Sequence, residues 1–519
     1  MSELFNAVKK YDNGTVTENG CAAYKSTLSA CLDLFFNACS CRADNGRTSQ
    51  LVRDAFNEDK LTCMRLLFYI RDVRGGQGER NVFRVGMKEL AKFAPKDIKN
   101  VLAHVPFFGR WDDLLALVGI NSRLDEEIGN IVMEQANKDL KAFDEKRDHE
   151  ISLLWKWLPS ENASSKETIN LAKKVRKDFF KTSSKSYRKL LSKMRKVLRI
   201  VERDISSKEY KLINYSALPS KAAQKYKAAF FRNDGERYTK YIEDLSQAVQ
   251  EGRKDVKINT STLYPYEIVK DLVASVVDWG GRKFTKEELM LLDATWKSQK
   301  DYFTKDSKHE NWLVVSDVSG SMYCCDHLPI SASISLAMYT AEHNTGVFAD
   351  KFITFSSRPE FISINRDWTL KQKIETISRA PWGMNTNLEA VFDMILEAAQ
   401  SYNVAPAEMP SALLIISDMQ FDEATCDRTG YNSNPNVTML RRIREKYATY
   451  GYTLPKIIFW NVAGDYKANV PALKNDNGVI LFSGYKPGMF DQMVNGTTPE
   501  QFMLSVVNSE RYSIVKIDE

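Results

Sequence analysis

The spacing of apolar residues changes near the middle of the chain. From the N-terminus to about residue 290, apolar side chains recur every three or four positions, and strand-like alternation is scarce. This spacing is typical of amphipathic helices, here joined by short polar loops, and no strict repeat period is visible. The pattern therefore predicts an irregular array of stacked helices. We expect them at residues 22–38, 59–73, 81–93, 111–118, 124–146, 167–181, 185–205, 220–231, 235–252 and 266–277.

From Asn311 onward, short apolar runs alternate with amphipathic segments. Strands are expected at 312–317, 352–356, 412–418, 456–462 and 479–484, and helices at 328–344, 370–379, 388–400, 436–450 and 499–509. Such alternation favours a doubly wound, mainly parallel sheet of the Rossmann-like kind. The predicted fold class is thus multidomain α plus α/β, with a helical region over residues 1–300 and an α/β domain over residues 305–519.

Composition excludes several classes of protein. The 519 residues are 43% hydrophobic and 27% charged, which is an ordinary globular mixture. No run of 18 uncharged apolar residues exists, and the first residues hold no apolar stretch of signal-peptide length. We therefore expect a cytoplasmic protein without a membrane partner. The eight cysteines form no CxxC pair, so a zinc finger is not predicted and reduced thiols are expected.

Positive charge is concentrated in one segment. Residues 166–208 hold 15 Lys and Arg against four acids, a local net charge of +11, so the rest of the chain sums to −5 of the total +6. Within residues 185–205 the apolar side chains fall on one side of a helical wheel. Six cations fall on the opposite side, with no acid among them: Lys185, Lys189, Lys193, Lys196, Arg199 and Arg203.

Two interpretations of this basic stripe stay open. As one helix it would run for about 27 Å, long enough to face several phosphates spaced about 3.4 Å apart on a nucleic-acid strand. A solvated helix face is the ordinary alternative. Such a face usually mixes charges of both signs to gain pairs one turn apart, and this stripe does not. The basic stripe alone supports phosphate binding and simple solvation about equally.

Candidate metal ligands follow two of the predicted strands. Asp317, Ser319 and Ser321 come directly after the first strand of the second part, and Asp418 ends a later one. A loop that opens a helix offers the hydroxyl of Thr386. Ligands of doubly wound sheets bind beyond the carboxyl ends of strands, where these loops would meet. Carboxylate and hydroxyl oxygens suit Mg²⁺ or Mn²⁺, although such residues also serve as helix caps and turn formers.

The motifs DVSGS, GMNTN and IISD together resemble the metal-ion-dependent adhesion site (MIDAS) of von Willebrand factor A domains, over about residues 311–519. The resemblance implies that Asp317, Ser319 and Ser321 ligate the metal. It implies that Thr386 ligates directly or through water and that Asp418 acts through water. One coordination position would then accept an acidic side chain from a protein partner.

The first part carries its own resemblance, to the domain of unknown function 2828 family. It rests on RDVRGGQGERNVFR (71–84), PFFGRWDDLLAL (106–117), LLWKWLPSENASSK (153–166), the basic segment and LYPYEIV (263–269). The architecture is also similar, more distantly, to the Ro autoantigen and its TROVE module, where HEAT-like helical repeats form a ring closed by the A domain. That similarity implies binding of small noncoding or misfolded RNA, in a ribonucleoprotein.

Other signals are weaker. RGGQGER (74–80) invites a phosphate-loop interpretation, but no strand precedes it and no Lys-Ser or Lys-Thr follows, so a turn between helices is favoured. Cys324 and Cys325 are expected to be small buried residues rather than ligands.

No catalytic constellation stands out, so no enzyme is predicted. The expected function is non-enzymatic, Ro-like RNA binding beside a magnesium-type site. The alternative is a metal-dependent protein-interaction scaffold without RNA. Ring closure and oligomeric state are not determined.

Overall fold

The computed structural model describes residues 13–277, 281–302, 311–355, 359–379, 386–422, 439–466, 469–486, 488 and 497–517. Its first part is almost entirely helical after a short hairpin of β1 (Gly14–Val16) and β2 (Ala22–Tyr24). The helices are α2 (Ala30–Asn37), α3 (Asn45–Glu58), α4 (Lys60–Arg71), α5 (Arg80–Phe93), α6 (Pro95–Lys99), α7 (Val105–Phe108), α8 (Trp111–Leu115), α9 (Ser122–Asp144), α10 (Leu154–Trp157), α11 (Lys166–Val175), α12 (Ser184–Val197), α13 (Val201–Ser206), α14 (Ser220–Asn233), α15 (Gly235–Gln250), α16 (Pro265–Val277) and α17 (Lys286–Lys297).

Most of the predicted helices are present, and three differences are informative. The helix expected from residue 22 begins only at Ala30, because Ser29 caps it and Ala22–Tyr24 form β2 instead. The long helices α3 and α17 and the short helices α6, α7 and α10 were not predicted. The helix expected over 185–205 is broken in two, because Arg199 has a left-handed backbone (φ 46°) between α12 and α13.

The second part is built on a six-stranded sheet. Its strands are β3 (Trp312–Asp317), β4 (Lys351–Phe355), β5 (Glu360–Ser363), β6 (Ala412–Ser417), β7 (Lys456–Asn461) and β8 (Val479–Ser483). Its helices are α18 (Cys324–His343), α19 (Leu370–Ile377), α20 (Leu388–Ser401), α21 (Met439–Thr449) and α23 (Pro499–Val507). The order is β5-β4-β3-β6-β7-β8, and among these strands β5 alone runs antiparallel to its neighbour.

This topology confirms the predicted mainly parallel, doubly wound sheet and adds β5, an edge strand that was not predicted. The chain winds outward from β3 in one direction through β4 and in the other through β6. The carboxyl ends of β3 and β6 therefore lie side by side where the direction of winding changes, which is the usual place for a ligand site.

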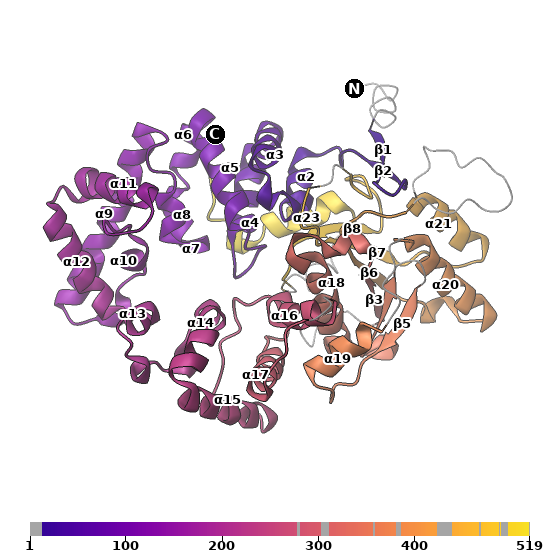
Figure 1. Cartoon of the computed structure of the whole chain (residues 1–519). Helices are drawn as coiled ribbons and strands as arrows, with labels where there is room; N and C mark the ends of the chain where they lie inside the picture. The colour runs from indigo at the N-terminus through magenta and orange to yellow at the C-terminus, as the bar shows by residue number, and fades with distance from the viewer. Residues whose placement is uncertain are drawn as a thin grey trace.

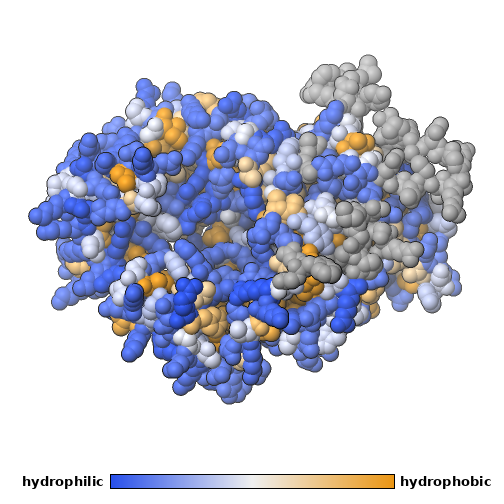
Figure 2. All heavy atoms as spheres, in the orientation of Figure 1, coloured by the Kyte–Doolittle hydropathy of each residue, from blue (hydrophilic) through white to orange (hydrophobic). Residues whose placement is uncertain are grey.

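The helical part meets the sheet part at two places, so the chain closes on itself as a ring (Figure 1). At one end, α2 packs on β8, and α23 packs on both α4 and β8. At the other end, α16 lies along α18, and both α16 and α17 contact α19. Between these ends the helices sweep round in an arc, and the face in Figure 2 is hollowed inside that arc. Ring closure is thus decided by the tertiary structure.

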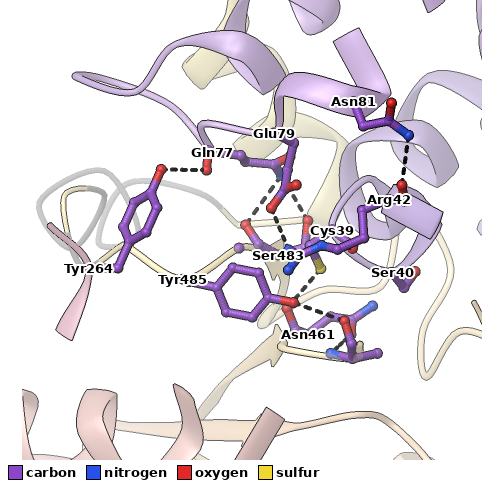
Figure 3. A network of polar contacts seen from close by, with 12 residues as sticks. Cys39, Ser40, Arg42, Gln77, Glu79, Asn81, Tyr264, Asn461, Ser483 and Tyr485 are labelled. Atoms are coloured by element: carbon purple, nitrogen blue, oxygen red, sulfur yellow. Dashed lines mark hydrogen bonds and ion pairs between the residues drawn. The ribbon is translucent and has the colours of Figure 1, made fainter. Parts of the chain in front are cut away.

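The first of these contacts contains a buried polar network (Figure 3). Its centre is Gln77, in the turn between α4 and α5. The side-chain amide of Gln77 donates to the carbonyl oxygens of Phe35 and Ser483 at 3.1 and 3.2 Å and to the Ser483 hydroxyl at 2.8 Å. The Tyr264 hydroxyl, from the segment before α16, donates to the Gln77 carbonyl oxygen at 3.1 Å. The RGGQGER segment is therefore a turn between helices, as expected, and it joins the ends of the arc.

Apolar packing is continuous across both parts. One cluster of buried side chains extends from Cys21 through the sheet to Val515, and a second lies among α13 to α17. None of the helices in the described ranges is long and apolar enough to cross a membrane.

Candidate metal centre and nucleic-acid interface

Two buried carboxylates lie at the neighbouring carboxyl ends of β3 and β6. Asp317 is fully buried, and Asp418 is only 5% exposed. Burial is the main cause that raises the pKa of Asp317 to about 7, and the negative charge of Asp418 raises it further. Two such carboxylates repel each other when both are ionised, so a cation between them would stabilise the charged pair.

Hydroxyl groups surround the Asp317 carboxylate. The Ser319 backbone N–H donates to Asp317 Oδ1 at 2.9 Å, and the Ser319 and Ser321 hydroxyl oxygens are 3.3 Å apart. On the other side, the Ser417 hydroxyl donates to Asp317 Oδ2 at 2.5 Å. Sequence analysis missed Ser417, although its hydroxyl immediately precedes Asp418 at the strand end. The tight turn after β3 thus gathers one carboxylate and two serine hydroxyls, as the alternating positions predicted.

Thr386 is the fifth predicted ligand, and its hydroxyl is notable. Thr386 is fully buried, and its Oγ1 has no hydrogen-bond partner among the described residues. The backbone of Thr386 is fixed by Asp422, whose carboxylate accepts from the Thr386 N–H at 2.7 Å and whose N–H donates to the Thr386 carbonyl at 2.9 Å. A buried hydroxyl without a partner is costly, and a bound water or ion is one way in which such a group is satisfied. Residues 380–385, which include most of the GMNTN motif, lie outside the described residues.

The donor chemistry fits a hard divalent cation. The oxygen atoms available are two carboxylates and three hydroxyls, and Mg²⁺ and Mn²⁺ prefer oxygen ligands. In the described part of the chain no three His, Cys, Asp or Glu side chains come together as a metal cluster. A site here would therefore depend on serine and threonine oxygens, as the resemblance to the adhesion site implies.

The adjacent cysteines differ from the expectation of buried residues. Cys324 is half-buried and Cys325 is exposed. The reason is local: Cys325, Asp326 and His327 all have left-handed backbones, with φ between 53° and 59°, which turns this segment outward before α18 continues. Burial raises the pKa of the Cys324 thiol to about 12, so this sulfur is a poor thiolate ligand.

The six cations of the basic stripe are all exposed: Lys185, Lys189, Lys193, Lys196, Arg199 and Arg203. Within the described structure none of these six cations forms an ion pair with an acidic side chain. The ammonium group of Lys193 lies 3.9 Å from the centre of the Phe143 ring. We call these six residues the basic face. Because Arg199 lies in the break after α12 and Arg203 lies in α13, the basic face covers two short helices rather than one straight one.

The opposite side of α12 anchors it firmly. Tyr187, Leu191 and Met194 are buried. The Arg195 guanidinium donates to the carbonyl oxygens of Trp155 and Leu158 at 2.9 and 2.6 Å. The helix therefore holds its basic face toward solvent in a fixed orientation.

A second cationic cluster was not predicted, and it includes an exposed aromatic ring. Phe107 is 55% exposed, and the Arg511 guanidinium lies 5.7 Å from its ring centre. Arg74 donates to the Phe107 carbonyl oxygen at 3.4 Å. Burial lowers the pKa of Lys486 to about 8, and the positive charges of Lys300, Arg511 and Arg74 lower it further. The buried carboxylate of Asp72, which forms an ion pair with Arg511, acts in the opposite direction and raises this pKa. Residues separated by more than 400 positions meet here, so no local sequence pattern indicates the cluster.

Two protein families match the chain in adjoining parts. The family described as Domain of unknown function (DUF2828) matches residues 17–123 and 122–308, and Domain of unknown function (DUF7788) matches residues 311–513. An uncharacterized protein of Acanthamoeba polyphaga mimivirus is 30% identical over 534 residues, which cover 95% of this chain and 87% of the viral protein. The chain belongs to the DUF2828 family. In this DUF2828 protein the two matches adjoin at residues 308–311, between α17 and β3.

Among solved structures, the DUF2828 protein is similar to the crystal structure of the Deinococcus radiodurans RO (RSR) protein. The alignment covers 88% of this chain and 93% of that chain, with 14% sequence identity and a TM-score of 0.43.

Proposed function

We propose that this DUF2828 protein is a non-enzymatic RNA-binding protein that contacts RNA phosphates through its basic face. The observation that carries the proposal is the exposure of six cations on α12, α13 and the break between them, with no acidic partner among the described residues. A face that merely solvates a helix gains from mixed charges. A face of one sign, held outward by Arg195 and the buried side of α12, is suited to an anionic polymer.

The second cluster supports a particular kind of nucleic acid. Phe107 offers an exposed ring beside the exposed Arg74 and beside Arg511, whose guanidinium is paired with the buried carboxylate of Asp72. Unpaired bases stack on such rings, whereas bases inside a duplex are already stacked. We therefore propose a small RNA with both structured and single-stranded parts. The basic face would contact its phosphates, and the Phe107 cluster would contact an unpaired base.

The proposal includes a Mg²⁺ or Mn²⁺ ion at the adhesion-type site. Asp317, Ser319 and Ser321 would hold it, the Thr386 hydroxyl would gain a partner, and Asp418 would act through water. A bound divalent ion supplies a positive centre that attracts an anionic oxygen. The surrounding residues bury the carboxylates and fix the orientation of their oxygens.

A charge-reversal experiment tests RNA binding. Lys189, Lys193 and Lys196 are changed together to Glu, and affinity for single-stranded and hairpin RNA is measured over a range of salt concentrations. The salt slope is the fall in the logarithm of the binding constant per unit of the logarithm of salt concentration. Each lost phosphate contact should lower this slope by about 0.7 to 0.9, so the triple variant should lose about two to three units. The matched control changes the exposed Lys240, Lys371 and Lys516 to Glu, which alters the net charge equally at other places.

The two variants distinguish RNA binding at the basic face from general attraction of RNA by the protein's net charge. Weaker binding by the first variant alone supports the basic face. Unchanged affinity and slope in a folded first variant would overturn the proposal, and equal losses in both variants would indicate only nonspecific attraction.

A second function is favoured by the partly exposed Ser321 beside two buried carboxylates. In this alternative the protein is a scaffold whose metal ion is completed by an acidic side chain of a protein partner. Asp317→Ala should then abolish both Mg²⁺ binding and EDTA-sensitive recovery of partners. Recovery of the same partners by this variant would exclude the scaffold function.

A further inference from the structure

The N-terminal hairpin lies directly against the segment that follows β6. The Thr17 hydroxyl donates to the Phe421 carbonyl oxygen at 2.5 Å, and Gly20 forms a β-bridge with Asp422. The side chain of Asn19 donates to the Gln420 carbonyl oxygen at 2.9 Å. About 400 residues separate these partners. The hairpin precedes the whole helical array, yet it contacts the strand end that carries Asp418.

Gln420 is the centre of this contact. It is only 1% exposed, and its backbone N–H donates to Asp418 Oδ1 at 3.1 Å. Its side-chain oxygen accepts from the Glu18 N–H at 3.1 Å, and its side-chain nitrogen donates to Asn469 Oδ1 at 3.0 Å. Gln420 thus joins the hairpin to a carboxylate of the candidate metal site.

The backbone between these residues is held in an unfavourable conformation. Met419, between Asp418 and Gln420, is a buried non-glycine residue with a left-handed φ of 68°. Such a conformation costs energy and persists only where neighbouring contacts fix it. Here the Met419 N–H donates to the Ser417 hydroxyl at 3.0 Å, and Asn469 donates to the Met419 carbonyl at 3.4 Å.

The same segment also positions Thr386. Asp422, which pairs with Gly20 of the hairpin, holds the Thr386 backbone through both of its hydrogen bonds. Asp418 and Thr386 are therefore both fixed by a short stretch of chain on which the hairpin rests.

We infer that Gln420 is a positioning residue of the metal site and that docking of the N-terminal hairpin is coupled to occupancy of that site by a divalent cation. The inference rests on the proposed metal site. By linkage, if the docked hairpin favours the arrangement of Asp418 and Thr386 that binds the cation, then the cation strengthens docking by the same factor. The first residues of the helical part thereby contribute to a site in the sheet part.

Two variants test the coupling through Mn²⁺ affinity, measured on the full chain by electron paramagnetic resonance. Gln420→Ala removes both side-chain contacts of this buried residue and should raise the Mn²⁺ dissociation constant by about tenfold. Asn19→Ala alters an exposed hairpin residue that contacts the chain after β6 from outside. This variant should raise the Mn²⁺ dissociation constant by about fivefold. Val16→Thr is the matched control, because Val16 lies in the same hairpin and is 61% exposed.

Hydrogen exchange gives the reciprocal measurement. The amides of Glu18 and Tyr24 donate across to Gln420 and Val470, so they report docking. The amides of Thr17 and Cys21 donate within the hairpin. Undocking of the hairpin should weaken cation binding by some factor. Adding Mg²⁺ should slow amide exchange at Glu18 and Tyr24 by that same factor, with a smaller change at Thr17 and Cys21. Asn19→Ala should reduce this effect.

The outcomes separate the inference from the proposed site. If the wild-type protein binds Mn²⁺ but Asn19→Ala and Gln420→Ala bind it equally well, the coupling is wrong and the metal site stands. If wild-type protein and Asp317→Ala both fail to bind Mn²⁺, the metal site and the coupling are both overturned. Weaker binding by both variants, with Val16→Thr unchanged and Mg²⁺-dependent protection at Glu18, supports the inference.

Discussion

The side-chain amide of Gln77 donates to both the carbonyl oxygen and the hydroxyl of Ser483, at 3.2 and 2.8 Å, although 406 positions separate the two residues. Gln77 belongs to the turn between α4 and α5, and Ser483 ends β8. The same nitrogen also donates to the Phe35 carbonyl oxygen. This one side chain therefore joins two helical elements to the far edge of the sheet and closes one end of the ring.

Replacing Gln77 should weaken this closure. Gln77→Leu keeps a similar volume but removes the donor, so buried oxygen atoms at Ser483 lose a partner. The expected loss of unfolding free energy is about 1 to 3 kcal/mol. Urea unfolding followed by tryptophan fluorescence measures it. Gln50→Leu is the control, because Gln50 is exposed on α3. Equal stability of the two variants would show that the Gln77 contacts do not hold the ring closed.

Breaking a buried ion pair should lower the unfolding free energy more than replacing Gln77. The Arg71 guanidinium, 5% exposed, pairs at 2.6 Å with the fully buried carboxylate of Asp113, which also accepts from Arg84 at 2.6 Å. Asp113→Ala leaves Arg71 buried without an anion, so the unfolding free energy should fall by about 3 to 5 kcal/mol. Asp112→Ala, at a side chain that is 25% exposed, should cost about 1 kcal/mol or less. Chemical denaturation compares them, and a similar loss in both would refute the argument.

Metal removal should lower thermal stability. A cation that binds only the folded state adds about 2.7 kcal/mol when its concentration is 100 times the dissociation constant. The melting temperature of the wild-type protein should therefore rise with Mg²⁺ and fall again with EDTA. Asp317→Asn removes one of two repelling buried carboxylates, so in EDTA this variant should melt no lower than the wild type and should not respond to Mg²⁺. A Mg²⁺ response that survives in Asp317→Asn would place the ion elsewhere.

Stacking on Phe107 should distinguish unpaired from paired RNA. Phe107→Ala should weaken binding of a single-stranded oligonucleotide by about 1 to 3 kcal/mol, because one base loses its stacking surface. Binding of a blunt duplex should change little. Fluorescence anisotropy with both RNAs measures the difference. Tyr402→Ala, at a ring that is 83% exposed and follows α20, controls for loss of an exposed aromatic residue. Equal effects on the two RNAs would exclude stacking at Phe107.

Local patterns predicted much of the fold. The strands around Val314 and Ile415 are buried along their whole length, so each is a continuous apolar run, and these runs predicted both strands. The break at Arg199 was not predicted, because a left-handed residue leaves the helical spacing on both sides intact. The hairpin before Ala30 was missed because its three-residue strands are too short to show alternation.

In the candidate metal site, too, local features could be predicted from sequence and long-range contacts could not. Asp317, Ser319 and Ser321 are neighbours in sequence, so their arrangement after β3 could be predicted from one turn. Ser417 and Gln420 contribute through contacts with distant partners, Asp317 and the hairpin, and no local pattern marks such roles.

By itself, the sequence determined the helical and α/β halves, the family resemblance, the one-sided basic face and the turn that carries the candidate ligands Asp317, Ser319 and Ser321, because each depends on side chains close together in the chain. The tertiary structure alone decided ring closure, the Phe107 cluster and the link between the hairpin and Asp418. These depend on contacts such as Gln77 with Ser483 and Asn19 with Gln420, each across about 400 residues. Such pairings are selected by the packing of the whole chain, since buried polar groups are stable only where distant partners complete their hydrogen bonds.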